Sequence, residues 1–332
     1  MRLAVSLAMG ALLVGLAGGL PASRAHSSPP QAPDSVAAEL VLPGLVSTPF
    51  DELNAAFTPD GRELYWSINS VQGPAGVGVI VMARQGKDGR WSRPELASFS
   101  GRFSDYDPFV APDGKHLFFI SNRPKGADTW DADDFDIYAV ERQGDHWGAP
   151  ARLEGPVNSP APEYYPSVAA NGNLYFSSTR PGSKGLDIFR SRFVDGHYQE
   201  PENLGEAVNG TAPTAEIDNY GAPDESFIVF AAFRRGGIGS QDLYVSFNQH
   251  GTWTPSRILP KGINSTAREY TPIGSPDGKY LYFTSMRGFT DDSLPRRLTL
   301  KEWRDSIQSI RNGNGNVYRV PLSAVLALRA AP

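Results

Sequence analysis

Five acidic residues recur at one position of a repeated sequence unit. Each lies seven residues before the proline of a Pro-Asp-Gly turn or its equivalent. The five are Glu52, Asp105, Glu163, Glu216 and Glu269. Carboxylates gathered in a ring could bind a cation or a basic peptide, or could supply the acid and the base of a glycoside hydrolase. The alternative is that they tie neighbouring repeats together through hydrogen-bonded ion pairs.

Three further positions repeat beside these acids. Tyrosine follows three of them directly, at Tyr106, Tyr164 and Tyr270. An arginine follows the second strand of four units, at Arg123, Arg180, Arg234 and Arg287, and an aspartate opens the next strand at Asp136, Asp187 and Asp242. The first unit has Ser70 and Gly78 at these two positions. This joint absence predicts that the arginine and the aspartate pair within a unit. The acids, tyrosines and arginines are the candidate ligand-binding residues.

The second unit carries a long acidic loop, from Ala127 to Asp136. Alternating carboxylates suit a hard cation such as calcium, which makes Asp131, Asp133 and Asp134 candidate metal ligands. The loop lacks the glycine and the final glutamate of an EF-hand, so a solvated acidic loop is the alternative. Trp130 is expected to be exposed there, where its ring could stack on a sugar or a peptide side chain. Calcium apart, no cofactor is expected.

Short strands must position these residues. The turn prolines, or their equivalents, are spaced by 53, 58, 53 and 53 residues. An apolar strand precedes each turn and an aromatic, β-branched strand follows it, such as Tyr280 to Thr284. A third strand and an outer strand complete each unit. This pattern predicts an all-β fold, a five-bladed β-propeller of four-stranded antiparallel blades.

The two ends of the repeat region predict how the ring closes. The fifth unit stops after its third strand, Val317 to Val320, whereas the chain begins with an unpaired strand, Leu40 to Pro43. That N-terminal strand is expected to complete the last blade. The propeller would then span 39–326, followed by a C-terminal tail, 327–332. A six-bladed ring is the alternative, although no residues remain for a sixth blade, and a solenoid would need capping repeats.

An insertion in the fifth unit, Phe289 to Gly315, contains a predicted helix over 299–310. Thr299 and Glu302 form a capping box. Leu300, Trp303, Ile307 and Ile310 form one apolar stripe. We expect this stripe to pack onto the face of the propeller as a lid or wall.

The repeat resembles a known family. Its elements are [Asp/Glu]-Tyr-x-Pro, Pro-Asp-Gly-Lys, an aromatic strand, Ser-x-Arg and Asp-Ile-Tyr, and they are similar to the WD-repeat-like propeller repeat of TolB-type proteins. The resemblance covers nearly the whole chain beyond the leader and implies the propeller fold. Such repeats occur in translocation-accessory propellers, in enzyme-associated domains and in proteins of unassigned role. TolB has an additional N-terminal α/β domain, for which too few residues precede the first strand here, so its partner binding is not carried over.

The first 38 residues are typical of export. Residues 1–25 have a positively charged start, an apolar segment and a small-residue cleavage site, which predicts a signal peptide, and 26–38 predict a flexible leader. A periplasmic or secreted location follows, with no membrane span in the mature chain. There is no cysteine, hence no disulfide. The formal net charge of −5 argues against nucleic-acid partners.

The sequence has none of the common catalytic motifs. It contains no Gly-x-Ser-x-Gly elbow, no His-Glu-x-x-His and no phosphate-binding loop. It therefore favours an exported, monomeric, non-catalytic binding or scaffold propeller of the bacterial periplasm, which docks a peptide, protein or glycan at its channel-mouth face. The alternative function is a glycan-active hydrolase or lyase that uses carboxylates at the mouth.

Overall fold

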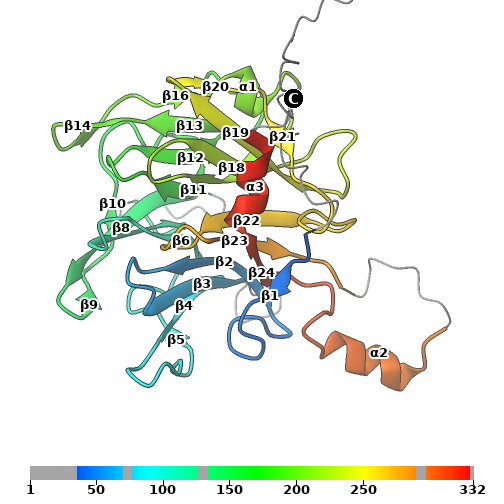
Figure 1. Ribbon diagram of the computed structural model, residues 1–332. Coiled ribbons are helices and arrows are strands. Elements are labelled where there is room, and N and C mark those ends of the chain that lie inside the picture. Colours follow the sequence, from blue (N-terminus) through cyan, green and yellow to red (C-terminus); the bar gives the residue numbers. More distant parts are fainter. Residues whose placement is uncertain (1–35, 70–76, 126–133, 289–296, 330–332) are drawn as a thin grey trace, which may run out of the picture. The chain divides into compact units, whose positions relative to one another are not determined.

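Five antiparallel sheets, each built on a path of four strands, form a β-propeller in the computed structural model (Figure 1). In four of them the strands follow the sequence order from the centre outward, and in the fifth the outermost strand comes from the N-terminal end. The structure describes residues 36–69, 77–125, 134–288 and 297–329. The predicted all-β class, five blades and four-stranded units are confirmed.

Each blade occupies one segment of the chain. Blade 1 contains β2 (Asp51–Phe57), β3 (Glu63–Asn69), β4 (Val79–Arg84) and β5 (Glu95–Leu96). Blade 2 contains β6 (Asp105–Val110), β7 (His116–Ser121), β8 (Asp136–Gln143) and β10 (Ala151–Arg152), with the short β9 (His146–Trp147) paired to β8. Blade 3 contains β11 (Glu163–Val168), β12 (Leu174–Ser178), β13 (Asp187–Ser191) and β16 (Glu202–Asn203), beside the hairpin of β14 (Phe193–Val194) and β15 (His197–Tyr198).

The last two blades follow the same order. Blade 4 contains β17 (Glu216–Gly221), β18 (Phe227–Ala232), β19 (Asp242–Gln249) and β21 (Arg257–Ile258), with β20 (Thr252–Trp253) paired to β19. Blade 5 contains β22 (Glu269–Gly274), β23 (Tyr280–Ser285), β24 (Asn316–Pro321) and β1 (Glu39–Leu40). The helices are α1 (Glu206–Asn209), α2 (Leu300–Ile307) and α3 (Leu322–Leu326), which continues into a 3-10 turn at Ala327–Arg329.

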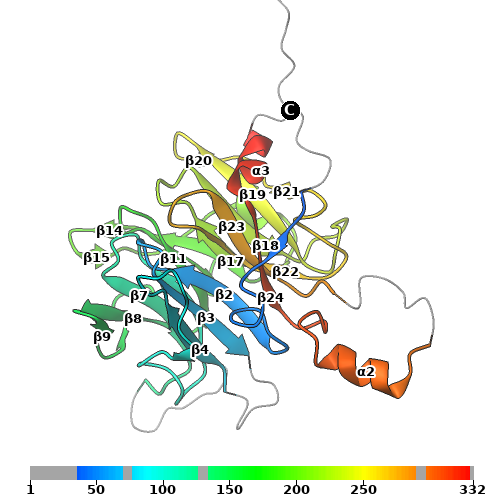
Figure 2. The ribbon, with the colours of Figure 1, turned by 60° about the horizontal axis from the view of Figure 1, so that its bottom comes forward.

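The ring is closed by the N-terminal strand, as predicted. Leu40 pairs with Tyr318, and the amide of Val41 donates to the carbonyl of Val317 at 2.9 Å, so β1 lies beside β24 (Figure 2). The strand ends earlier than the predicted Pro43 because Leu42 has a positive φ of 41° and turns the chain. The edge of blade 5 is therefore covered by the other end of the propeller chain.

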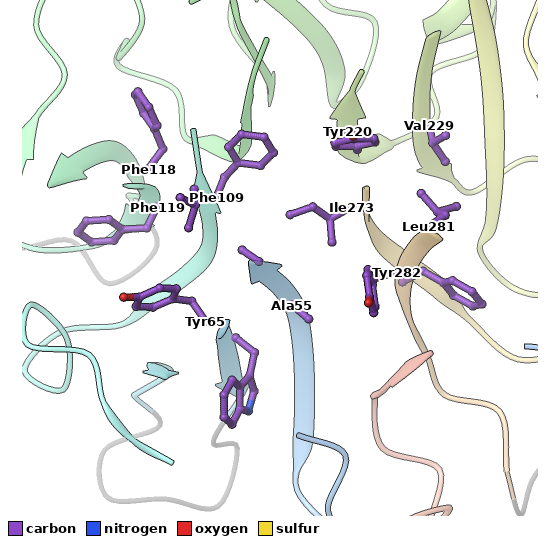
Figure 3. Close-up of a cluster of buried hydrophobic side chains, with 14 of the residues drawn as sticks. Ala55, Tyr65, Phe109, Phe118, Phe119, Tyr220, Val229, Ile273, Leu281 and Tyr282 are labelled. Atoms are coloured by element: carbon purple, nitrogen blue, oxygen red, sulfur yellow. The ribbon is translucent and has the colours of Figure 1, made fainter. Parts of the chain in front are cut away.

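The core lies between neighbouring blades. The second strand of each blade is buried on both faces, as its aromatic and β-branched composition predicts. Phe119, Phe176, Phe230 and Phe283 occupy equivalent positions in these strands and are almost fully buried. Figure 3 shows side chains of this core from neighbouring blades, such as Tyr65 of blade 1 and Phe119 of blade 2.

The innermost strand of every blade is bulged at the same place. The residue two positions after the repeated acid has a positive φ, between 46° and 57°, in Asn54, Asp107, Tyr165, Asp218 and Thr271. The strand register shifts across this residue in each sheet. Residues from all five blades, four of these five among them, line one small cavity, which places it on the axis of the ring.

In the part of the chain that the structure describes, no helix is long and apolar enough to span a membrane.

Candidate functional site at the channel mouth

Three of the predicted positions meet at one end of each blade. In blade 3, Glu163 is paired with Ser178 and Ser178 with Asp187. The same ladder joins Asp105, Ser121 and Asp136 in blade 2. The acid, the end of the second strand and the start of the third strand therefore lie on one face, as predicted. We call this face the channel mouth.

The five acids are buried rather than presented to solvent. Each has 0% of its surface exposed. In four blades a guanidinium nitrogen lies close to a carboxylate oxygen, at 2.7 Å for Arg123–Asp105, 2.8 Å for Arg180–Glu163, 3.0 Å for Arg234–Glu216 and 3.3 Å for Arg287–Glu269. Of the two uses foreseen for the ring, these contacts support the structural one.

The predicted pairing of arginine with the third-strand aspartate is wrong. Arg123 Nε donates to Ser121 Oγ at 2.8 Å, which turns the guanidinium toward Asp105 in the first strand. Asp136 instead accepts from Arg152, with Oδ2 2.7 Å from Nε. In blade 4, Asp242 accepts from the backbone amides of Ile238 and Gly239. These aspartates therefore bond to residues of their own blade and not to the repeated arginine.

Each arginine holds the loop that enters its blade. Arg180 Nη1 donates to the carbonyl of Pro156 at 3.0 Å, and Nη2 also donates to the carbonyl of Val157. Its Cζ lies 4.7 Å from the centre of the Phe176 ring. Charge-assisted hydrogen bonds and the aromatic face compensate for burial of the guanidinium. Arg123, Arg234 and Arg287 make the corresponding contacts.

Blade 1 departs from this arrangement. Ile68 stands opposite Glu52 in the sheet, where blades 2, 3 and 5 have serine. Ser70, at the arginine position, lies outside the described residues. Glu52 accepts from the amide of Thr48 at 3.1 Å and from the Thr48 hydroxyl. Burial raises the pKa of Glu52 to about 7, because within the described residues no cation offsets the loss of water.

Gly78, predicted at the aspartate position of blade 1, lies one residue before it, because Val79 pairs with Ile68 as Asp136 pairs with Ser121. Packing requires the glycine there. A Cβ built on it would lie 1.9 Å from Cζ of Tyr106, so any larger residue would displace the Tyr106 ring. The tyrosine hydroxyl donates to Asn69 Oδ1 at 3.2 Å. The ring of Tyr106 therefore lies against the start of the third strand of blade 1.

The three candidate tyrosines differ in exposure. Tyr270 is buried, whereas Tyr106 and Tyr164 are half-buried on either side of Phe135. The ring centres are 6.0 Å apart for Tyr106 and Phe135 and 5.9 Å apart for Phe135 and Tyr164. Tyr165 extends the series, 5.8 Å from Tyr164. These four rings form what we call the aromatic arc of the mouth.

Two carboxylates near the axis were not identified from sequence. Asp107 and Asp218 occupy the bulge positions of blades 2 and 4 and are 1% and 2% exposed. Among the described residues, Asp107 Oδ2 and Asp218 Oδ1 have no hydrogen-bond partner. Burial raises the pKa of Asp218 to about 7 and that of Asp107 well above its usual range, where the charge of Asp218 adds to the effect. The sequence did contain a signal for them, because the equivalent residues of the other three blades, Asn54, Tyr165 and Thr271, are not acidic.

The predicted helix of the insertion is confirmed, but its packing is not. α2 has the predicted capping box between Thr299 and Glu302. Leu300, Trp303 and Ile307 face solvent, at 61%, 53% and 46% exposed, so the lid contact predicted for them is wrong. The helix ends at Ile307 rather than 310, and Ile310 lies beyond it and is half-buried. The helix is held at its C-terminal end instead, where Asn312 Nδ2 donates to the carbonyls of Ile307 and Pro49.

Phe50, which follows Pro49, is 65% exposed. We call Phe50, Leu300, Trp303 and Ile307 the Phe50–α2 surface. It belongs to the β23–β24 connection and to the segment that enters blade 1, both at the channel mouth. Large apolar side chains left in water in one sector of a face are typical of interaction sites.

The acidic loop of blade 2 is only partly described. Trp130, Asp131 and Asp133 lie outside the described residues. Asp134 pairs with Lys125, with Oδ2 2.7 Å from Nζ, and the same ammonium lies 3.1 Å from Asp136. Within the described ranges no group of three His, Cys, Asp or Glu residues could hold a metal ion. The calcium prediction thus stays a prediction.

Comparisons with known proteins found similar solved structures but no similar sequence family. No protein-family profile and no curated protein matches the sequence. Among solved structures, the chain is similar to TolB from Acinetobacter baumannii, with 17% identity, a TM-score of 0.45, and coverage of 82% of this chain and 54% of that one. It is also similar to an α-L-arabinofuranosidase from Lactobacillus brevis, with 13% identity, a TM-score of 0.49, and coverage of 88% and 94%.

A protein of unknown function from Dyadobacter fermentans is a third similar structure, with 13% identity, a TM-score of 0.44, and coverage of 86% and 98%. The chain spans about half the length of the TolB chain that it matches. These matches identify neither a ligand nor a reaction.

Proposed function

We propose that this chain is an exported binding propeller that attaches to a partner protein through the Phe50–α2 surface. The observation that carries the proposal is the difference between two sets of residues at the channel mouth. The repeated acids and arginines make contacts inside the blades, as Glu163 and Arg180 do. The large apolar side chains of the Phe50–α2 surface are instead exposed to water. An exposed apolar surface that includes a tryptophan is best explained by a partner.

The spacing of the exposed residues indicates how the partner binds. Leu300, Trp303 and Ile307 follow an i, i+3, i+7 series on one side of α2. This is the pattern by which an amphipathic helix inserts into an apolar groove. The opposite side is polar and includes the pair Lys301–Asp305, whose charged atoms are 2.6 Å apart. We therefore propose a partner with a hydrophobic groove, and the aromatic arc would extend the contact toward the channel.

Export is part of the same proposal. The N-terminal segment has the pattern of a signal peptide, and an extracytoplasmic location would place the surface among envelope or secreted proteins. The mature form would be a monomer until it meets its partner.

The test is the affinity for a partner recovered from an extract of the cell envelope. Trp303→Ser should raise the dissociation constant of the complex with the purified partner by about 30-fold, since a buried aromatic anchor contributes about 2 kcal/mol or more to the binding free energy. Phe193→Ser is the matched control, because Phe193 is 41% exposed but lies on the β14–β15 hairpin at the opposite face. Equal affinities of the two variants, or a partner lost only with Phe193, would refute the proposed surface.

Glycan hydrolysis is the second candidate function. The observation that favours it is the pair of axial carboxylates, Asp107 and Asp218, whose pKa values are raised by burial as in acid–base pairs. The five repeated acids do not favour it, because four of them pair with arginines inside the blades and Glu52 accepts from Thr48. Hydrolysis of arabinan, xylan or another neutral polysaccharide that is lost in Asp218→Asn would establish this function in place of the binding role.

A further inference from the structure

A polar groove lies between blades 1 and 2 on the face opposite the channel mouth. Its volume is about 400 Å³, within the range of about 300–1,000 Å³ that is typical of small-molecule sites. The Pro-Asp-Gly turns of both blades line it. They are in contact there, since a Cβ added to Gly114 would lie 3.4 Å from Cγ of Pro59. The groove is thus a feature of the junction between two blades.

One wall of the groove is a preorganised ionic network around Glu63. The side chain of Glu63 is 10% exposed, and its carboxylate oxygens lie 2.8 Å from Arg142 Nη1 and 3.1 Å from Arg84 Nε. The hydroxyl of Tyr65 also donates to it, at 2.7 Å. Burial alone would raise the pKa of Glu63, but these hydrogen bonds lower it to about 2. The network is therefore charged and fixed at all physiological pH values.

The network has a counterpart between blades 3 and 4, where the Tyr175 hydroxyl donates to Glu225 and Trp253 packs against the Tyr175 ring, but there the acid comes from a turn and not from the second strand. The second strands of the other blades open with His116, Leu174, Phe227 and Tyr280, none of them an acid. Trp147 of blade 2 reinforces the wall, since its Nε1 donates to the Tyr65 hydroxyl at 2.8 Å and the Arg142 Cζ lies 4.8 Å from its ring. What distinguishes blade 1 is the position of its acid, which places a fixed carboxylate and its two arginines in the wall of the groove.

The balance of charge indicates the class of ligand. Three guanidinium groups and three carboxylates line the groove: Arg62, Arg84, Arg142, Asp60, Glu63 and Asp113. An anion would meet the carboxylates and a cation the arginines, so neither is favoured by the groove as a whole. A neutral molecule with many hydroxyl groups can use both kinds of partner, because each hydroxyl donates and accepts.

We infer that this groove is a carbohydrate-binding site, which takes a neutral oligosaccharide whose hydroxyls bond to Arg62, Arg84 and Asp60. The side chain of Arg84 is 46% exposed, and its Nε and Nη1 lie 3.1 Å from Glu63 and 3.0 Å from Glu95, so Nη2 is the nitrogen that would bond to a ligand. This site lies on the other face from the Phe50–α2 surface and does not depend on the function proposed for it.

The test is calorimetric titration with maltotriose, cellotriose and chitotriose, each at up to about 10 mM. At least one trisaccharide should bind, and Arg84→Ala should weaken it by about tenfold or more. Arg192→Ala should leave the affinity unchanged, since Arg192 is a 58% exposed arginine at the same end of blade 3 that also pairs with a glutamate. Melting temperatures of both variants control for folding.

Three results would overturn the inference. One is the absence of binding by all three trisaccharides. A second is binding that Arg84→Ala and Arg62→Ala leave unaltered. The third is tighter binding of citrate or sulfate than of any sugar, which would make the groove an anion site.

Discussion

Replacement of Glu52 by glutamine should stabilise the propeller at alkaline pH. Glu52 is buried and contacts no cation among the described residues, so its ionised form is not compensated. Its pKa rises from 4.5 in a free chain to about 7 in the fold. Since each pKa unit corresponds to 1.36 kcal/mol, ionisation of Glu52 reduces the free energy of unfolding by about 3 kcal/mol. Glutamine keeps the shape and can retain the hydrogen bond from Thr48 without the charge.

The pH dependence follows from the direction of the shift. A carboxyl with a raised pKa holds its proton more tightly in the folded state than in the unfolded state. Its contribution to stability is therefore complete below pH 4.5 and is lost as the pH rises through about 7. Urea unfolding, followed by tryptophan fluorescence at pH 5 and pH 8, measures this loss in the wild type. In Glu52→Gln the difference between the two pH values should shrink by about 2–3 kcal/mol.

Glu163→Gln is the matched control, because it makes the same change at the equivalent position of blade 3. There the substitution leaves Arg180 buried without its carboxylate, which should destabilise the fold by about 3–5 kcal/mol. The two variants should therefore move in opposite directions at pH 8. If Glu52→Gln is as destabilising as Glu163→Gln, or leaves the pH dependence intact, then Glu52 has a cationic partner and the reasoning is refuted.

Three further predictions concern the scaffold. Val41→Pro removes the amide that bonds to Val317 and should lower the free energy of unfolding by about 1–3 kcal/mol, seen as an earlier urea midpoint; an unchanged midpoint would show that β1 does not close the ring. Gly78→Ala should cost about 1–3 kcal/mol by thermal unfolding, since its Cβ would overlap the Tyr106 ring, and wild-type stability would contradict that packing. Arg180→Lys should lower the free energy of unfolding in urea by about 2 kcal/mol, because a single ammonium does not match the planar fork that bonds Glu163, Pro156 and Val157. Wild-type stability of this variant would mean that the positive charge alone suffices.

Much of the fold could be predicted because its signals are local and repeated. The Pro-Asp-Gly turns and the aromatic strands after them recur at nearly constant spacing, which determined the number of blades. The closing strand could be predicted from two incomplete ends that complement each other. The capping box of Thr299 and Glu302 correctly located α2.

The contacts of the candidate site could not be read from spacing. Arg180 pairs with Glu163 rather than Asp187 because its guanidinium folds back toward the first strand, a choice of rotamer that the sequence does not encode visibly. The bulge that turns Asp107 and Asp218 toward the axis breaks the two-residue period of a strand, so these carboxylates were missed. The stripe of α2 was expected to pack onto the face of the propeller because an apolar helical face usually packs on its own domain.

The central claim, that the channel mouth binds a partner through its non-repeated apolar residues, is tested most directly by photo-crosslinking in intact cells. A benzophenone amino acid would replace Trp303 in one variant and Val194, which is 47% exposed on the opposite face, in another. We predict a single discrete adduct from position 303, abolished when Leu300 and Ile307 are both changed to serine, and none from position 194. No adduct at 303, or the same adduct from both positions, would contradict it.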